Sequence, residues 1–176
     1  MINLFEKGTL EYLLYLKNYI DTVQWHLEDI VRNPQIDPVQ GLELKRRIDK
    51  SNQERTDLVE QVDDYFLEHY ATVIPLDDAT INTESPAWAI DRLSILVLKI
   101  YHMEEEVNRE GASATHRAAC SSKLNVLRTQ QSDLSQSIDE LLFDILSGKK
   151  KMKVYRQMKM YNDPTLNPVL YNLKGA

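Results

Sequence analysis

The sequence predicts an all-α protein, built as an elongated antiparallel four-helix bundle with a basic C-terminal tail. Over four long segments, apolar residues recur at alternating three- and four-residue steps, which places them on one face of a helix. The prolines stand between these segments, at their first position or in the tail after them, where they do not interrupt a helix. Residues 1–148 contain no segment that is convincing as a strand.

The first helix is expected over residues 9–33, after a lead-in at 1–8. Asn33-Pro34 ends it, because the residue before a proline disfavours the helical conformation. Its apolar stripe consists of Leu13, Leu16, Ile20, Val23, Leu27 and Ile30.

The second helix is expected over residues 38–70. Asp37 is suited to cap its first turn, and Pro38 is suited to the first helical position. Its apolar stripe consists of Leu44, Ile48, Leu58, Val62 and Phe66.

The third and fourth helices are expected over residues 86–110 and 113–147. Ser85-Pro86 opens the third helix, and glycine follows each of the two helices, as is common at helix C-termini. Short connections make the first and second helices, and the third and fourth, antiparallel neighbours. The longer connection at 71–84 is expected to cross one end of the bundle.

Composition and length are those of a soluble single domain. The chain has 176 residues, of which 43% are hydrophobic and 27% charged. No apolar run is long enough to span a membrane, and charges interrupt the region where a signal peptide needs an apolar stretch. The single Cys120 leaves no internal disulfide, which favours a reducing compartment, so we expect a cytoplasmic protein.

Charge is distributed unevenly along the chain. Residues 149–176 contain seven basic residues and one acid, which leaves 14 basic and 26 acidic residues in 1–148. The body therefore carries a charge of −12 and the tail +6. Such an acidic body repels phosphate backbones, so we expect no nucleic-acid partner. The tail is expected to pack on this body or on a partner, and its apolar residues favour the body.

The apolar stripe of the second helix breaks between Ile48 and Leu58. Continuing the stripe places Ser51 and Arg55 on the inward face, where an unpaired polar group costs about 1–3 kcal/mol. Partners are expected on the last turns of the first helix. The resulting candidate cluster consists of His26, Glu28, Asp29, Lys45, Asp49, Asn52 and Arg55.

Two interpretations of this cluster compete. In one, it is a buried polar network that fixes the register of the helices. In the other, it lines a cleft that holds a metal or a small anionic ligand. A surface for a partner protein is a third interpretation.

No catalytic residue, metal ligand or cofactor is assigned from the sequence. None of the four histidines has a glutamate three residues before it, so the Glu-x-x-His pairs of di-iron bundles are absent. There is no glycine-rich phosphate loop and no Gly-x-Ser-x-Gly motif. Cys120 is expected to be a core residue in the middle of a helix, with no candidate base nearby in the sequence.

Three stretches of the chain resemble a bacterial family known as domain of unknown function 4254. They are Trp25-His26-Leu27-Glu28-Asp29-Ile30-Val31-Arg32, Leu44-Lys45-Arg46-Arg47-Ile48-Asp49 and Asn52-Gln53-Glu54-Arg55-Thr56-Asp57-Leu58-Val59-Glu60. The tail at 159–164 is similar to that of members from Bacteroides-type bacteria. The resemblance implies a fold and no catalytic residues, because the family has no established activity. It also implies a setting beside glycosyltransferases of surface-polysaccharide assembly.

We therefore expect a non-catalytic, cytoplasmic helical-bundle protein that binds a protein partner, as a homodimer or with a glycosyltransferase of surface-polysaccharide assembly. The alternative is an enzyme or small-molecule binder that holds a phosphorylated or sugar-linked ligand in the candidate cluster.

Overall fold

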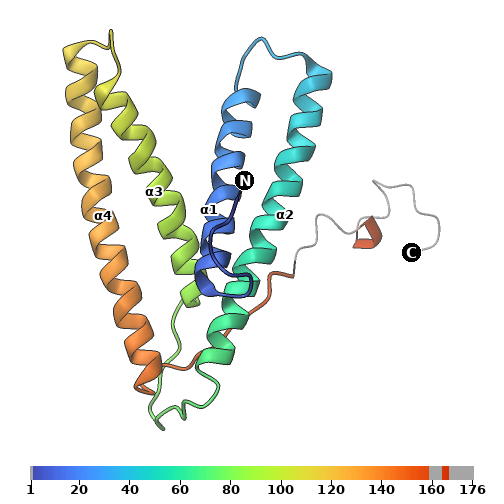
Figure 1. Cartoon of the computed structure of the whole chain (residues 1–176), viewed down its shortest axis with the longest axis vertical. Coiled ribbons are helices and arrows are strands. Elements are labelled where there is room, and N and C mark those ends of the chain that lie inside the picture. Colours follow the sequence, from blue (N-terminus) through green and yellow to red (C-terminus); the bar gives the residue numbers. More distant parts are fainter. Residues whose placement is uncertain (1, 159–163, 167–176) are drawn as a thin grey trace.

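The computed structural model describes residues 2–158 and 164–166, and it confirms the all-α four-helix bundle (Figure 1). Its elements are α1 (Leu10–Val31), α2 (Pro38–His69), α3 (Pro86–Asn108), α4 (Ala114–Leu146) and a 3-10 turn, η1 (Pro164–Leu166). Each end of a long helix lies within two residues of its expected position. No helix among the described residues is long and apolar enough to cross a membrane.

Side-chain caps fix the starts of the four long helices. The Asp37 carboxylate accepts hydrogen bonds from the backbone amides of Val39 and Gln40, each at 3.0 Å. Thr9, Ser85 and Ser113 each accept one such bond from the backbone three residues ahead. These bonds satisfy amides that have no partner within the helix, so the helix starts follow from the sequence.

The helices form two antiparallel hairpins, α1–α2 and α3–α4 (Figure 1). α1 and α3 run parallel, and α3 contacts both α1 and α2. Among the described helices, the backbone of α4 lies close to that of α3 alone. Leu142 of α4 also packs against an apolar cluster whose members come from α1, α2 and α3. The two hairpins meet in the lower half of Figure 1 and diverge toward the connections at 32–37 and 109–113. The bundle is therefore open at one end.

The apolar core is divided in the same way. One cluster is shared between the hairpins and includes Leu13, Val59, Phe66 and Ala87. A second, around Leu27, Leu44 and Ile48, lies within the α1–α2 hairpin. A third, around Leu96, Ile100 and Leu124, lies within the α3–α4 hairpin. Beyond the shared cluster, each hairpin therefore has an apolar cluster of its own.

The connection at 71–84 passes under the closed end of the bundle and is held by the chain that follows α4 (Figure 1). The Leu76 amide donates to the Gly148 carbonyl at 2.9 Å, and the Thr80 amide donates to the Lys149 carbonyl at 3.0 Å. Thr80 and Lys150 form an isolated parallel bridge, too short to leave an alternating pattern in the sequence. Gly148 has a positive φ of 74°, and a Cβ there would lie 2.9 Å from the Ile74 carbonyl oxygen.

Residues 149–158 continue without helical structure, and part of this segment lies against α2. Met152 packs against the shared apolar cluster. Arg156 pairs with the carboxylates of Asp64 and Glu60 on α2. The expectation that the whole tail packs on the bundle or on a partner extends to residues 159–163 and 167–176, which lie outside the described residues.

Candidate functional site

Four charged side chains from three helices meet inside the bundle. α1 contributes Lys17 and Asp21, α2 contributes Arg55, and α3 contributes Asp91. The residues Lys17, Asp21 and Asp91 are only 2%, 6% and 3% exposed. Arg55 donates from Nε and Nη2 to the two oxygens of Asp91 at 2.9 and 2.5 Å. Lys17 pairs with both Asp21 and Asp91, so two cations neutralise two buried anions.

Hydrogen bonds complete this buried charge network. The Lys17 ammonium donates to Asp21, to the Asp91 carboxylate and to the Asp91 backbone carbonyl, so its three protons have partners. The Ser94 hydroxyl donates to Asp21 Oδ2 at 2.7 Å and accepts from the Asn18 amide at 3.1 Å. Asp21 Oδ1 has no hydrogen bond, but it lies 3.5 Å from Arg55 Nε.

The contacts within the network favour the ionised forms of Arg55 and Asp91. Hydrogen bonding to Asp91 raises the pKa of the Arg55 guanidinium. Burial pushes the pKa of Asp91 upward, but the hydrogen bond from Arg55 and the charge of Lys17 outweigh burial and leave that pKa below its usual value. Groups that already satisfy one another offer little to a ligand, so this arrangement favours a structural role for the network.

The polar break in α2 is explained by a contact with α1. The Gln24 side-chain amide donates to Asn52 Oδ1 at 2.8 Å, and the Ser51 hydroxyl donates to Gln24 Oε1 at 3.4 Å. Ser51 is buried and Asn52 is half-buried. Ser51 and Asn52 are therefore paired across the α1–α2 hairpin, whereas Arg55 pairs with Asp91 of α3.

A third buried acid, Asp63 of α2, lies apart from this network and next to the start of α3. It is fully buried, and neither of its oxygens has a hydrogen bond of ordinary geometry. Burial raises the pKa of Asp63, and this effect exceeds the opposite influences of the Ser85 hydroxyl and the Ala87 amide. The positive end of the α3 dipole faces this carboxyl group.

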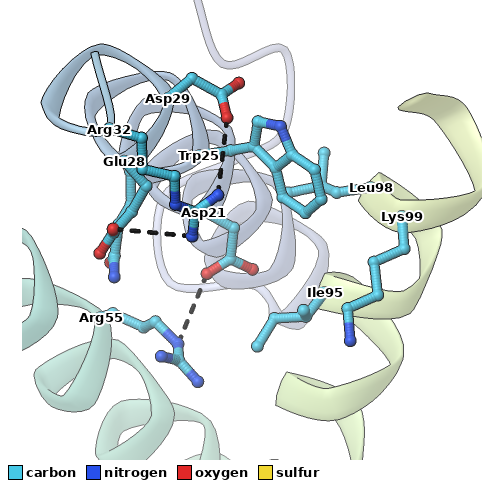
Figure 2. A pocket seen from close by; sticks show the side chains of 10 residues that line it. Asp21, Trp25, Glu28, Asp29, Arg32, Arg55, Ile95, Leu98 and Lys99 are labelled. Carbon is cyan, nitrogen blue, oxygen red and sulfur yellow. Dashed lines mark ion pairs between the residues drawn. The ribbon is translucent and has the colours of Figure 1, made fainter. Parts of the chain in front are cut away.

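A pocket of about 310 Å³ opens beside the network, between α1 and α3 (Figure 2). This volume is at the lower end of the range for small-molecule sites. Three acids and three bases are among its lining residues. The full lining consists of Asp21, Gln24, Trp25, Glu28, Asp29, Arg32, Arg55, Ile95, Leu98 and Lys99.

Most of the charges around this α1–α3 pocket are already paired. Arg32 lies 3.9 Å from Glu28 and 3.8 Å from Asp29, as Figure 2 shows, and Arg55 is held by Asp91. Lys99 makes no ion pair with any residue of the described part of the chain. Lys99 is therefore the cation of the pocket that remains available to an anion.

Trp25, which lines the α1–α3 pocket, belongs to a group of ring contacts between α1 and α3. The Trp25 indole stacks on the His102 ring, with centroids 4.6 Å apart and planes 11° from parallel. His26 meets the same ring edge-on at 6.1 Å. These contacts join the last turns of α1 to α3.

The family model described as "Protein of unknown function (DUF4254)" matches residues 11–154. The match extends from the first turn of α1 to beyond the end of α4, and covers well over half of the chain. The chain belongs to the DUF4254 family. Comparison with curated proteins and with solved structures finds no match.

The DUF4254 chain distributes the seven candidate residues over several places. Asn52 and Arg55 are half-buried, and Arg55, Glu28 and Asp29 line the α1–α3 pocket. The structure brings no side chain of His26, Glu28 or Asp29 into an ion pair with Arg55. Lys45 and Asp49 instead pair with each other on the exposed face of α2.

Three members of the charge network of this DUF4254 protein were not predicted from the sequence. They are Lys17, Asp21 and Asp91. Lys17 and Asp21 stand four residues apart beside the apolar stripe of α1, and that spacing was the signal available for them. It carries little weight, because lysine–aspartate pairs at this spacing are usual on exposed helix faces.

The expectation that Cys120 has no candidate base nearby is wrong. His116, one helical turn earlier, places Nε2 3.3 Å from the Cys120 sulfur. Cys120 is buried, as expected for a helix core residue. The four-residue spacing of the pair was visible in the sequence.

Proposed function

We propose that this DUF4254 protein is a non-catalytic binding protein that associates through the groove between α3 and α4, and that its first partner is a second copy of itself. One observation carries the proposal: among the described helices, the backbone of α4 lies close to that of α3 alone. In a closed four-helix bundle, the other hairpin covers this face.

The groove has the composition of a helix-docking surface. Its volume is about 580 Å³, and its floor is formed by Ile95, Leu96 and Leu134. Arg92, Lys99 and Asp133 line it as charged residues. Val126, which is 57% exposed, stands four residues before Gln130 and therefore on the side of α4 that lines the groove. An amphipathic helix recognises such a groove by placing its apolar face on the floor.

The charges of the groove favour self-association. A twofold interface brings the same surface of two subunits together, so each surface must be complementary to itself. The groove contains charges of both signs, with two bases on α3 and one acid on α4. Two copies that meet in antiparallel orientation then bring the bases of each against the acid of the other.

Light scattering coupled to size exclusion tests this proposal over a wide range of protein concentration. We expect a species of twice the chain mass of 20.5 kDa. Val126→Glu places a charge in the groove and should shift the equilibrium to the monomer. Val97→Glu is the matched control, because Val97 is 39% exposed and occupies the opposite face of α3. A monomer at every concentration refutes self-association.

Heterologous partners are a separate part of the proposal. The resemblance set out in the sequence analysis gives glycosyltransferases of surface-polysaccharide assembly as the first class to test. A defined enzyme of that class, mixed with wild type and with Val126→Glu, should bind the wild type more tightly if it uses the same groove. Equal binding to both proteins rejects the groove as its site.

A second candidate function is the binding of a small anionic or sugar-linked ligand in the α1–α3 pocket. The unpaired Lys99 beside the Trp25 indole favours it. A thermal-shift screen with sugar phosphates and nucleotide sugars tests it, since a ligand at a hundred times its Kd adds about 2.7 kcal/mol of stability. A shift that survives in Lys99→Ala rejects this pocket as the site.

A further inference from the structure

Three side chains with different metal-binding chemistries converge at the tip of the α3–α4 hairpin. Glu106 lies in the last turn of α3, and His116 and Cys120 lie in the first two turns of α4. His116 Nε2 is 2.8 Å from Glu106 Oε2 and 3.3 Å from Cys120 Sγ. One carboxylate oxygen, one imidazole nitrogen and one sulfur all lie within 4.8 Å of one another.

The fold explains this convergence. His116 and Cys120 are four residues apart, so both side chains lie on the same face of α4. The connection at 109–113, in which Gly111 has a positive φ of 77°, turns the chain back on itself. That turn brings Glu106 of the third helix against His116 of the fourth.

We propose that Glu106, His116 and Cys120 bind a divalent transition-metal ion, with Zn²⁺ the best fit. A thiolate and an imidazole are the ligands that zinc prefers, whereas Mg²⁺ and Ca²⁺ take oxygen ligands. Three protein ligands with water in the fourth position make an open tetrahedral site. The sequence alone predicts no metal ligand here, because no histidine has a glutamate three residues before it.

Two of the three separations between ligand atoms are close to those of a tetrahedral zinc site. Bonds of about 2.0–2.3 Å at tetrahedral angles separate nitrogen from oxygen by about 3.4 Å and nitrogen from sulfur by about 3.6 Å. The corresponding separations of 2.8 and 3.3 Å are shorter, so the ligands must move apart by less than about 1 Å. The side chains of Glu106 and His116 are 43% and 41% exposed, which leaves room for this movement.

Arg109 competes with the ion. Its Nε lies 3.1 Å from Glu106 Oε2, and its Nη2 lies 3.4 Å from His116 Nε2. A metal ion needs both of those acceptor atoms, so the guanidinium must leave when the metal binds. The Arg109 side chain is 55% exposed and can turn into solvent. Removal of Arg109 should therefore tighten metal binding, which a merely structural ion-pair cluster does not predict.

Titration of the reduced full-length chain with Co²⁺, which replaces Zn²⁺ in such sites, tests the proposal. Thiolate coordination should give a sulfur-to-cobalt charge-transfer band at one ion per chain. Zn²⁺ should abolish the band by competition. We expect His116→Ala and Glu106→Gln to weaken Co²⁺ binding at least tenfold, and Arg109→Ala to strengthen it.

Two controls keep the result interpretable. His69→Ala removes an exposed histidine on α2, outside the cluster, and should bind Co²⁺ as the wild type does. Cys120→Ser removes the proposed thiolate ligand at a buried position, and circular dichroism reports whether this variant still folds. The proposal is overturned if no charge-transfer band forms, or if the band persists unchanged in the folded His116→Ala variant.

Discussion

Asp91→Asn is the sharpest test of the buried charge network. The substitution preserves the size of the side chain and removes its charge. In the wild type, Asp91 accepts two hydrogen bonds from Arg55 and pairs with Lys17 at 2.8 Å. After the change, two buried cations share the single carboxylate of Asp21, which lies 3.5 Å from Arg55.

The expected loss follows from leaving a buried charge without its partner. Removing one member of a buried ion pair typically costs about 3–5 kcal/mol, because the remaining charge stays desolvated. For a domain of this size, each kcal/mol lowers the Tm by about 2–4 °C, so the Tm should fall by roughly 6–20 °C. The Arg55 side chain is 25% exposed and can recover some solvation, which favours the lower half of this range.

Urea unfolding followed by circular dichroism measures the change, provided that the m-value is the same in both proteins. Asp49→Asn is the matched control. It breaks the Lys45–Asp49 pair, whose side chains are 60% and 49% exposed, and should cost no more than about 1 kcal/mol. If Asp91→Asn costs no more than Asp49→Asn, the network does not stabilise the fold and our reasoning is wrong.

Three further predictions concern pH and backbone strain. The raised pKa of Asp63 means that its charge opposes folding at neutral pH, so Asp63→Asn should raise the Tm at pH 7, with a gain that shrinks as the pH falls toward the unfolded value of about 4. The lowered pKa of Asp91 acts in the opposite sense: its contribution is present above about pH 4 and is lost below it, so acid unfolding should begin at higher pH in Asp91→Asn than in Asp49→Asn. Gly148→Ala should cost about 1–3 kcal/mol by chemical denaturation, because alanine there meets both a positive φ and the Ile74 carbonyl oxygen. A neutral result for Gly148→Ala would mean that the 71–84 connection moves away freely.

The fold was predictable because its determinants are local. The apolar stripes, Asp37 with Pro38 and the glycines after α3 and α4 are each contained within a few residues of the chain. Arg55 was identifiable as an inward polar residue for the same reason, since it falls on the stripe of its own helix.

The partners of Arg55 were not predictable in this way. Asp91 lies 36 residues away on α3, and Lys17 bonds to an oxygen of Asp91 across 74 residues. Helical periodicity states which face of a helix is inward, but it does not state which helix that face meets. The short connection between α1 and α2 led to the prediction that the partners of Arg55 lie on α1. In the structure, the parallel packing of α1 and α3 brings Lys17 and Asp21 next to Asp91.

Hydrogen bonds join Thr80, which precedes α3, to the chain after Gly148, which follows α4. The α3–α4 hairpin therefore leaves the rest of the fold and rejoins it at the same place. The length of the α3–α4 hairpin can consequently change without a change in the rest of the bundle. Adding seven residues to each of its two helices would carry the tip about 10 Å further from the bundle, at 1.5 Å per residue. With the added residues near the tip, the shared apolar cluster and the charge network would keep their contacts, because both lie closer to the closed end of the bundle. Related chains can therefore differ in how far the α3–α4 hairpin extends and keep the rest of the bundle unchanged.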